Sequence, residues 1–126
     1  MAGLTYDRGA LIAAERDDQL LWSLHRAALR RGLSPTVPSV VIAEAWRGGP
    51  QHRLSQFLKG CRVEPLCEEQ ARAVGALAGS SGLDDIVDVA VVEGALRRGD
   101  AVVTSNRSHV AQVADSVQGN LRVHDV

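Results

Sequence analysis

The stretch from Asp84 to Asn106, DDIVDVAVVEGALRRGDAVVTSN, decides the fold. Its first part predicts a helix, with acidic residues at the start, Arg97 and Arg98 in the last turn and Gly99 directly after them. The apolar run Ala101–Thr104 then predicts a short buried strand. A helix that leads straight into a buried strand is typical of a parallel sheet with crossover helices.

The rest of the chain repeats this alternation of strands and helices. Further strands are expected at Ala2–Tyr6, Thr36–Pro38, Arg62–Leu66 and Leu121–His124. Helices are expected from Ala10, from Asp18 to Arg31, from Ser39 as cap to Trp46, over Gln51–Lys59 and Glu68–Ala78, and from Arg107 to Val117. Gly79–Gly82 is interpreted as a loop. The pattern predicts an α/β fold with a mostly parallel central sheet and helices on both faces.

Length and composition favour one domain over residues 1–126, since 45% of the 126 residues are hydrophobic and 23% are charged. The formal net charge of −1 gives no general attraction to nucleic acid, so any such contact depends on local clusters. The two cysteines, Cys61 and Cys67, and the lack of a signal peptide favour a reducing, cytoplasmic location. No apolar run is long enough to cross a membrane, and we expect no membrane association.

Four polar positions fall where a metal site would need them. Asp7 closes the first strand and Asn106 follows the Ala101–Thr104 strand, so both belong to the edge where function gathers in parallel sheets. Glu44 and Asp88 stand among aliphatic neighbours, where an unpaired charge is costly unless it faces water or a cation. Asp84 and its neighbour Asp85 are interpreted first as residues of a helix start.

These residues resemble the PIN-domain nucleases, and among them the VapC-type toxins of bacterial toxin–antitoxin pairs. The matching segments occur in the family's order and cover nearly the whole chain: Tyr6–Ile12 (YDRGALI), Val37–Pro38, Ala43–Gly48 (AEAWRG), Asp85–Ala90 (DIVDVA) and Val102–Asn106 (VVTSN). The resemblance implies a three-layer α/β/α fold of the PIN type.

The resemblance also implies the site. It assigns the family's acidic positions to Asp7, Glu44 and Asp88, and its fourth position to Asn106, where many relatives have aspartate. Asp85 is expected to assist as an outer ligand. Oxygen ligands of this kind suit Mg²⁺ or Mn²⁺, and the sequence has no Cys/His cluster typical of zinc. The histidines at 25, 52, 109 and 124 show no ligand spacing and are interpreted as surface or structural residues.

The function expected from the resemblance is metal-dependent hydrolysis of RNA by the toxin of a VapBC-type pair. The expected partners are the RNA substrate, a small cognate antitoxin and a second copy of the chain in a homodimer. Arg8, Arg47 and Arg107 adjoin site positions and either bind phosphate or only decorate loops. Two alternatives stay open: a catalytically weakened PIN-like binding module, for which Asn106 is the only support, and a magnesium-binding switch domain of the flavodoxin type.

Overall fold

The computed structural model describes residues 3–116 and 121–126. Within these residues five strands form one sheet in the order β3-β2-β1-β4-β5, and every neighbouring pair is parallel. The strands are β1 (Leu4–Tyr6), β2 (Thr36–Pro38), β3 (Arg62–Glu64), β4 (Ala101–Thr104) and β5 (Val123–Asp125). The predicted parallel sheet is confirmed, and its strands all end at one edge.

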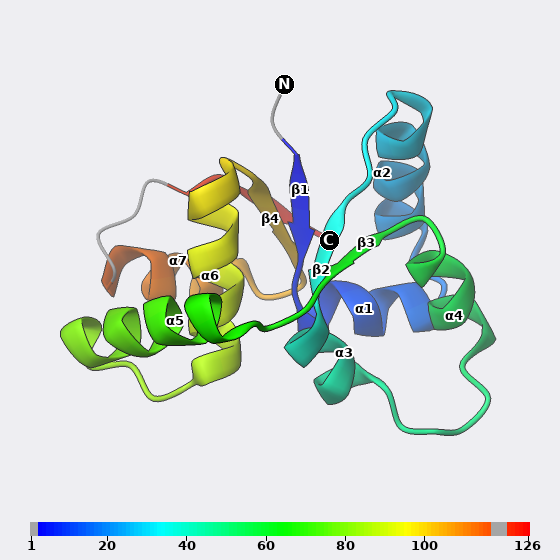
Figure 1. Ribbon diagram of the computed structural model, residues 1–126. Coiled ribbons are helices and arrows are strands. Elements are labelled where there is room, and N and C mark those ends of the chain that lie inside the picture. Colours follow the sequence, from blue (N-terminus) through cyan, green and yellow to red (C-terminus); the bar gives the residue numbers. More distant parts are fainter. Residues whose placement is uncertain (1–2, 117–120) are drawn as a thin grey trace.

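Helices cover both faces of the sheet, which makes the fold a three-layer α/β/α arrangement (Figure 1). On one side lie α1 (Arg8–Glu15), α2 (Gln19–Arg30) and α4 (His52–Leu58). On the other side lie α5 (Glu68–Ser81), α6 (Ile86–Arg98) and α7 (Arg107–Ser116). The short helix α3 (Ser39–Ala45) lies at the carboxyl edge of the sheet and contacts both α1 and α6.

The centre of the core is formed by β1 and β4 with the helices packed on them. All four residues of β4 are buried, and α6 buries Val89, Ala90, Val91 and Val92 in succession. On the other face the largest buried side chains include Tyr6, Leu11 and Phe57. Burial of this apolar surface fixes the two central strands, and with them the position of the residues that follow each strand.

Two helix starts differ from the sequence-based expectation. Helix α1 begins at Arg8, directly after β1, because the Asp7 side chain accepts a hydrogen bond from the Ala10 backbone N–H at 3.0 Å and caps the helix there. Ser39 was expected to cap α3, but it is already the first helical residue. The cap position is Pro38, and no side chain caps this helix.

The prediction that Gly79–Gly82 forms a loop is wrong. Helix α5 continues to Ser81, and only Gly82, with φ +74°, ends it in the left-handed conformation that favours glycine. The hydroxyl of Ser81 donates to the Leu77 carbonyl at 2.7 Å, so a residue expected to break the helix is satisfied by the preceding turn.

The other boundaries of helices and strands differ by a few residues from those predicted from the sequence. Strand β3 ends at Glu64, before the expected Leu66, and β5 covers Val123–Asp125. Helix α6 begins at Ile86 with Asp85 as its cap. Of the expected ends, Ala2 and Val117 lie outside the described residues.

A buried ionic network ties α6 to the sheet on the face opposite α1. The Arg98 guanidinium donates to Asp100 at 3.0 Å, to Glu64 at 2.8 Å and to the Thr5 hydroxyl at 2.9 Å. Thr5 in turn donates to Asp100 at 2.8 Å. Because these side chains are largely shielded from water, each charge depends on the others for its stabilisation.

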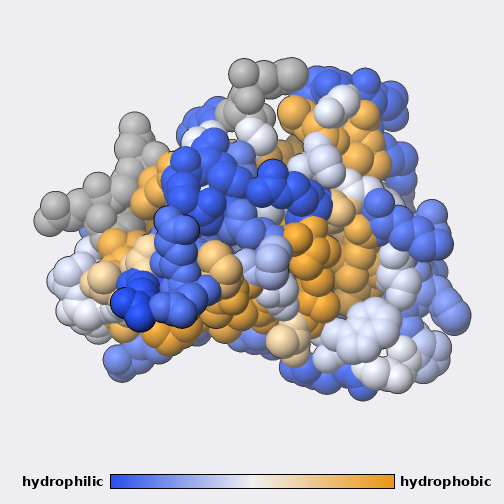
Figure 2. Space-filling model, viewed as in Figure 1, coloured by the Kyte–Doolittle hydropathy of each residue, from blue (hydrophilic) through white to orange (hydrophobic). Residues whose placement is uncertain are grey.

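The surface is mostly polar, with hydrophobic residues showing between charged ones in the middle of the face drawn in Figure 2. Within residues 3–116 and 121–126, the large hydrophobic side chains that are exposed are those of Leu20, Leu29, Trp46, Val63, Leu66 and Ile86. Among the described residues, no helix has both the length and the apolar character that a membrane crossing requires.

Candidate metal centre

A pocket of about 370 Å³ opens at the carboxyl edge of the sheet. It collects side chains from the ends of β1 and β4, from α3 and from the first turns of α6 and α7. All five residues expected from the sequence line it: Asp7, Glu44, Asp85, Asp88 and Asn106. The rest of its wall is formed by Arg8, Gly9, Ile12, Thr104, Ser105 and His109.

Asp7 lies deepest among the acids. Its backbone N–H donates to Val103 at 3.3 Å, which places it directly beyond the β1–β4 pairing. Burial raises the pKa of its carboxyl group above the ordinary 3.8, and the nearby Asp88 acts in the same direction. Hydrogen bonds from Thr104 and from the first amides of α1 lower the pKa and offset part of this rise.

Asp85 and Asp88 stand one helical turn apart at the start of α6. The Asp85 side chain caps the helix, accepting a hydrogen bond from the Asp88 backbone N–H at 3.2 Å. The pKa of Asp88 is raised, chiefly by burial and also by the neighbouring charge of Asp85, while its hydrogen bond with His109 lowers it.

Glu44 reaches the pocket from the last turn of α3. Burial raises the pKa of its carboxyl group, and the charges of Asp85 and Asp88 add to this rise, whereas Arg8 lowers it. Three carboxyl groups from three elements therefore carry raised pKa values in one pocket. A cluster of acids that destabilise one another fits a divalent cation, which removes their repulsion.

Asn106 has two roles at the start of α7. Its side-chain oxygen accepts a hydrogen bond from the His109 backbone N–H at 3.3 Å, and its own N–H donates to the Thr104 hydroxyl at 2.9 Å. It lines the pocket as expected, yet its oxygen also caps the helix.

His109 is exposed, as its interpretation as a surface residue expects, but it also contacts a site residue. Its Nε2 contacts Oδ2 of Asp88, and its side chain lines the acidic pocket. The signal that could have found it is the spacing Asn106-x-x-His109, because the third residue after a helix cap belongs to the first turn, beside the cap. Of the other histidines, His25 is buried in the core, while His52 and His124 are exposed.

The three arginines expected near the site separate in the structure. Arg8 lines the acidic pocket and also the neighbouring hollow of about 260 Å³, which Arg47 and Glu44 line as well. Arg107 instead lines a hollow between α7 and β5. Of the three arginines, only Arg8 lines the acidic pocket, whereas Arg47 lines the neighbouring hollow.

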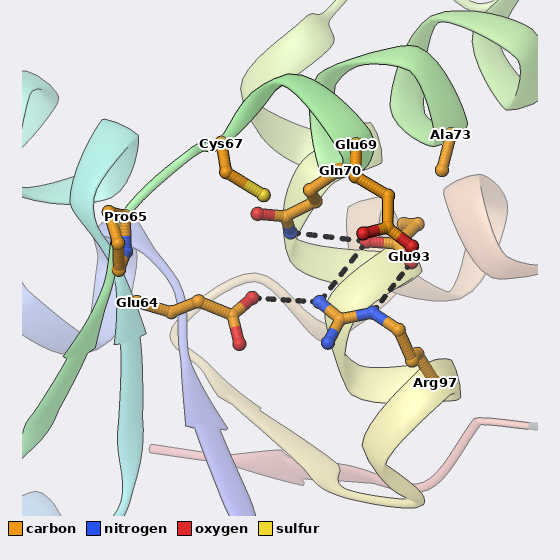
Figure 3. Close-up of a pocket in the computed structure, with 8 residues that line it drawn as sticks. All are labelled: Glu64, Pro65, Cys67, Glu69, Gln70, Ala73, Glu93 and Arg97. Atoms are coloured by element: carbon orange, nitrogen blue, oxygen red, sulfur yellow. Dashed lines mark hydrogen bonds and ion pairs between the residues drawn. The ribbon is translucent and has the colours of Figure 1, made fainter.

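A second hollow, about 360 Å³ between the end of β3 and helices α5 and α6, has different chemistry (Figure 3). Its only arginine, Arg97, donates to Glu64 at 2.7 Å and to Glu93 at 3.0 Å, and Gln70 donates to Glu93 at 3.1 Å. Two of its three glutamates are thus held by hydrogen bonds within the wall, and none of the residues predicted for the metal site lines this hollow.

The sheet order and the two helical layers define a three-layer α/β/α, PIN-like fold. Among solved structures, the chain is similar to VapBC2 from Rickettsia felis bound to a DNA fragment from their promoter. The TM-score is 0.73 at 14% sequence identity, over 98% of this chain and 98% of that chain. No protein-family model matches the sequence, and none of the curated proteins is a significant match. At this identity the likeness establishes the fold.

Proposed function

We propose that this protein is a metal-dependent ribonuclease that acts as the toxin of a VapBC-type toxin–antitoxin pair. The observation that carries the proposal is the gathering of Asp7, Glu44 and Asp88 in one pocket, from three separate elements, with Asp85 and Asn106 beside them. The fold shared with a VapBC structure supports the toxin assignment. Asp7 and Asp88 are the proposed main ligands of Mg²⁺ or Mn²⁺, with Glu44, Asp85 and Asn106 around them.

The divalent ion would supply the positive charge that lowers the barrier to attack of water on the phosphodiester. The chain's own residues have three tasks. Asp7 and Asp88 would hold the ion at the carboxyl edge, and Glu44 is the proposed acceptor of a proton there. Arg8, next to these acids, is the proposed contact for a phosphate oxygen of the substrate.

Helix starts add to the field at this site. The first turns of α1, α6 and α7 all begin at the pocket, each behind a residue that lines it. Backbone N–H groups at a helix start favour negative charge. They therefore help to keep carboxylates ionised in the absence of an ion and favour a phosphate next to them.

The test is cleavage of a labelled single-stranded RNA in Mg²⁺ or Mn²⁺, compared with chelator. Asp88→Asn keeps the size of the side chain and removes its charge, and we expect a loss of at least about 100-fold in rate. The matched control is Asp84→Asn, an exposed acid four residues away that lies outside the lining of the pocket. Wild-type protein that binds metal but leaves RNA intact would favour the binding-module alternative instead.

The proposed partners are a small antitoxin and a second copy of the chain. Expression of the protein alone should slow growth of the host cell, and co-expression of the open reading frame beside its gene should restore growth. Asp88→Asn should be harmless without the partner. A wild-type chain that leaves growth unchanged, and that sediments as a monomer at micromolar concentration, would contradict both parts of this proposal.

A further inference from the structure

We infer that His109 is a nitrogen ligand of the divalent ion, and that it gives this site a preference for Mn²⁺ over Mg²⁺. The inference rests on the proposed function, because the ion occupies the same pocket. The inference adds His109 to the acidic residues proposed as ligands. It also favours Mn²⁺ over Mg²⁺, a choice that the acidic residues alone leave open.

The ligand atoms are already close together. One ring nitrogen of His109 and one carboxylate oxygen each of Asp85 and Asp88 all lie within 4.8 Å of one another. Ligands held at about 2.1 Å from one ion are at most ~4.2 Å apart, so small side-chain rotations suffice to bring all three atoms to a common ion. Two different helices, α6 and α7, contribute to the group.

The His109 ring is directed to this point by the start of α7. Its backbone N–H is tied to the Asn106 side chain, and the Val110 N–H donates to the Asn106 carbonyl at 3.2 Å. The first turn of α7 is thereby anchored behind β4, beside the start of α6. From there Nε2 contacts Oδ2 of Asp88, so an imidazole nitrogen and a carboxylate oxygen face one another.

Nε2 of His109 and Oδ2 of Asp88 are both atoms of kinds that bind metal ions in proteins. In the metal-free protein they share a hydrogen bond, and coordination of one ion by both atoms replaces it. Asn106 brings no charge to the position next to them, and its oxygen is engaged as a helix cap. His109 therefore completes a ligand set that is one carboxylate short, without adding to the repulsion among the acids.

Nitrogen in the ligand set changes which metal binds best. Mg²⁺ prefers oxygen ligands and keeps much of its water, whereas first-row transition ions accept imidazole readily. Loss of the His109 side chain should therefore weaken the binding of Mn²⁺ much more than the binding of Mg²⁺. Loss of a residue that merely shaped the pocket would weaken both ions alike.

The experiment measures Mn²⁺ and Mg²⁺ affinity by calorimetry for wild type, His109→Ala and the control His52→Ala, which removes an exposed imidazole on α4. We expect His109→Ala to lose about tenfold in Mn²⁺ affinity and less than about twofold in Mg²⁺ affinity. His52→Ala should match wild type. Pulsed electron paramagnetic resonance of the Mn²⁺-loaded protein should show ¹⁴N coupling that His109→Ala removes.

Two results would overturn the inference and leave the acidic metal site in place: equal losses for both ions in His109→Ala, or Mn²⁺ bound by wild type without ¹⁴N coupling. Wild-type protein that binds neither ion would instead overturn the proposed metal-dependent function itself, and the inference with it.

Discussion

The phenol oxygen of Tyr6 lies 2.8 Å from Nδ1 of His25, and both side chains are buried in the core. Burial lowers the pKa of His25 from 6.5 to about 4, and the nearby charge of Arg26 acts in the same direction. Burial also raises the pKa of Tyr6, so its hydroxyl stays protonated and donates to the neutral ring. The His25 ring packs on Phe57 with 4.1 Å between centroids, and only 2% of His25 is exposed to the water that a charged imidazolium requires.

This pair predicts a loss of stability in mild acid. The unfolded chain binds a proton at His25 near pH 6.5, whereas the folded chain does so only near pH 4, so stability is complete above pH 6.5 and falls as the pH drops toward 4. The free energy of unfolding should decrease by about 2 kcal/mol between pH 7.5 and 5 from this group alone. Urea denaturation at the two pH values measures it.

The control is the double variant Tyr6→Phe/His25→Phe, which removes both hydrogen-bonding groups together and leaves no unpaired one. Its free energy of unfolding should change about 2 kcal/mol less than that of wild type over the same pH interval. An equal change in the two proteins would show that His25 is not the group responsible.

Removal of Arg98 should destabilise the fold strongly. Arg98→Ala leaves the buried carboxylate of Asp100 without its arginine and takes one of the arginines from Glu64, and we expect a loss of about 3–5 kcal/mol in chemical denaturation. The matched control is Arg72→Ala, whose ion pair with Glu68 on α5 is exposed and should contribute less than about 1 kcal/mol. Similar losses in the two variants would contradict this assignment.

A methyl group at Gly9 should damage the site more than the fold. A Cβ there would lie 2.2 Å from the Ser105 hydroxyl oxygen and 3.0 Å from the Ser105 backbone nitrogen, so the turn between β4 and α7 must shift. That turn carries Asn106 and leads into α7, the helix of His109. Gly9→Ala should therefore weaken Mn²⁺ binding several-fold at unchanged far-ultraviolet circular dichroism, and Gly9→Ala/Ser105→Gly should recover part of it. Wild-type affinity in Gly9→Ala would contradict this close packing.

Restoration of an acid at position 106 should strengthen metal binding. Asn106→Asp adds a negative charge to the pocket and keeps an oxygen that can cap α7. Desolvation and repulsion from Asp88 offset most of the added attraction, so the expected gain is about 1 kcal/mol, or near fivefold in Mn²⁺ affinity. Calorimetry at fixed pH and salt measures it. Unchanged affinity would mean that residue 106 serves only as the cap of α7.

The sequence predicts the fold well where periodicity and burial agree. The buried strand at Ala101–Thr104 and the helix before it follow from apolar patterning, and the structure confirms both. Prediction from sequence fails where tertiary packing overrides the local conformational preference of the residues. The Gly79–Gly82 segment has residues typical of loops, yet α5 continues through its first three, because Val74 and Ala78 on this helix pack against α6.

The acids of the site are predictable because each stands at a strand end or a helix position that the topology brings to one edge. The spacing Asn106-x-x-His109 places His109 in the first turn of α7, but its contact with Asp88 depends on the direction of the ring, which the spacing does not give. The pairing of Tyr6 with His25 is hidden for the same reason, since the two residues are brought together only when α2 packs on β1.

The capping roles of Asp7 and Asp85 set up a trade-off between activity and thermal stability. Asp7 holds the first turn of α1 and Asp85 that of α6, so an alanine at either position removes a helix cap worth about 1 kcal/mol together with a proposed metal ligand. Asparagine keeps the cap and removes the charge. In metal-free buffer the melting temperature of Asp7→Asn should therefore rise above that of wild type, because burial disfavours the ionised carboxylate of Asp7 and the charge of Asp88 adds to this. Saturating Mn²⁺ should reverse the order, since only the intact acid gains stability from the bound ion.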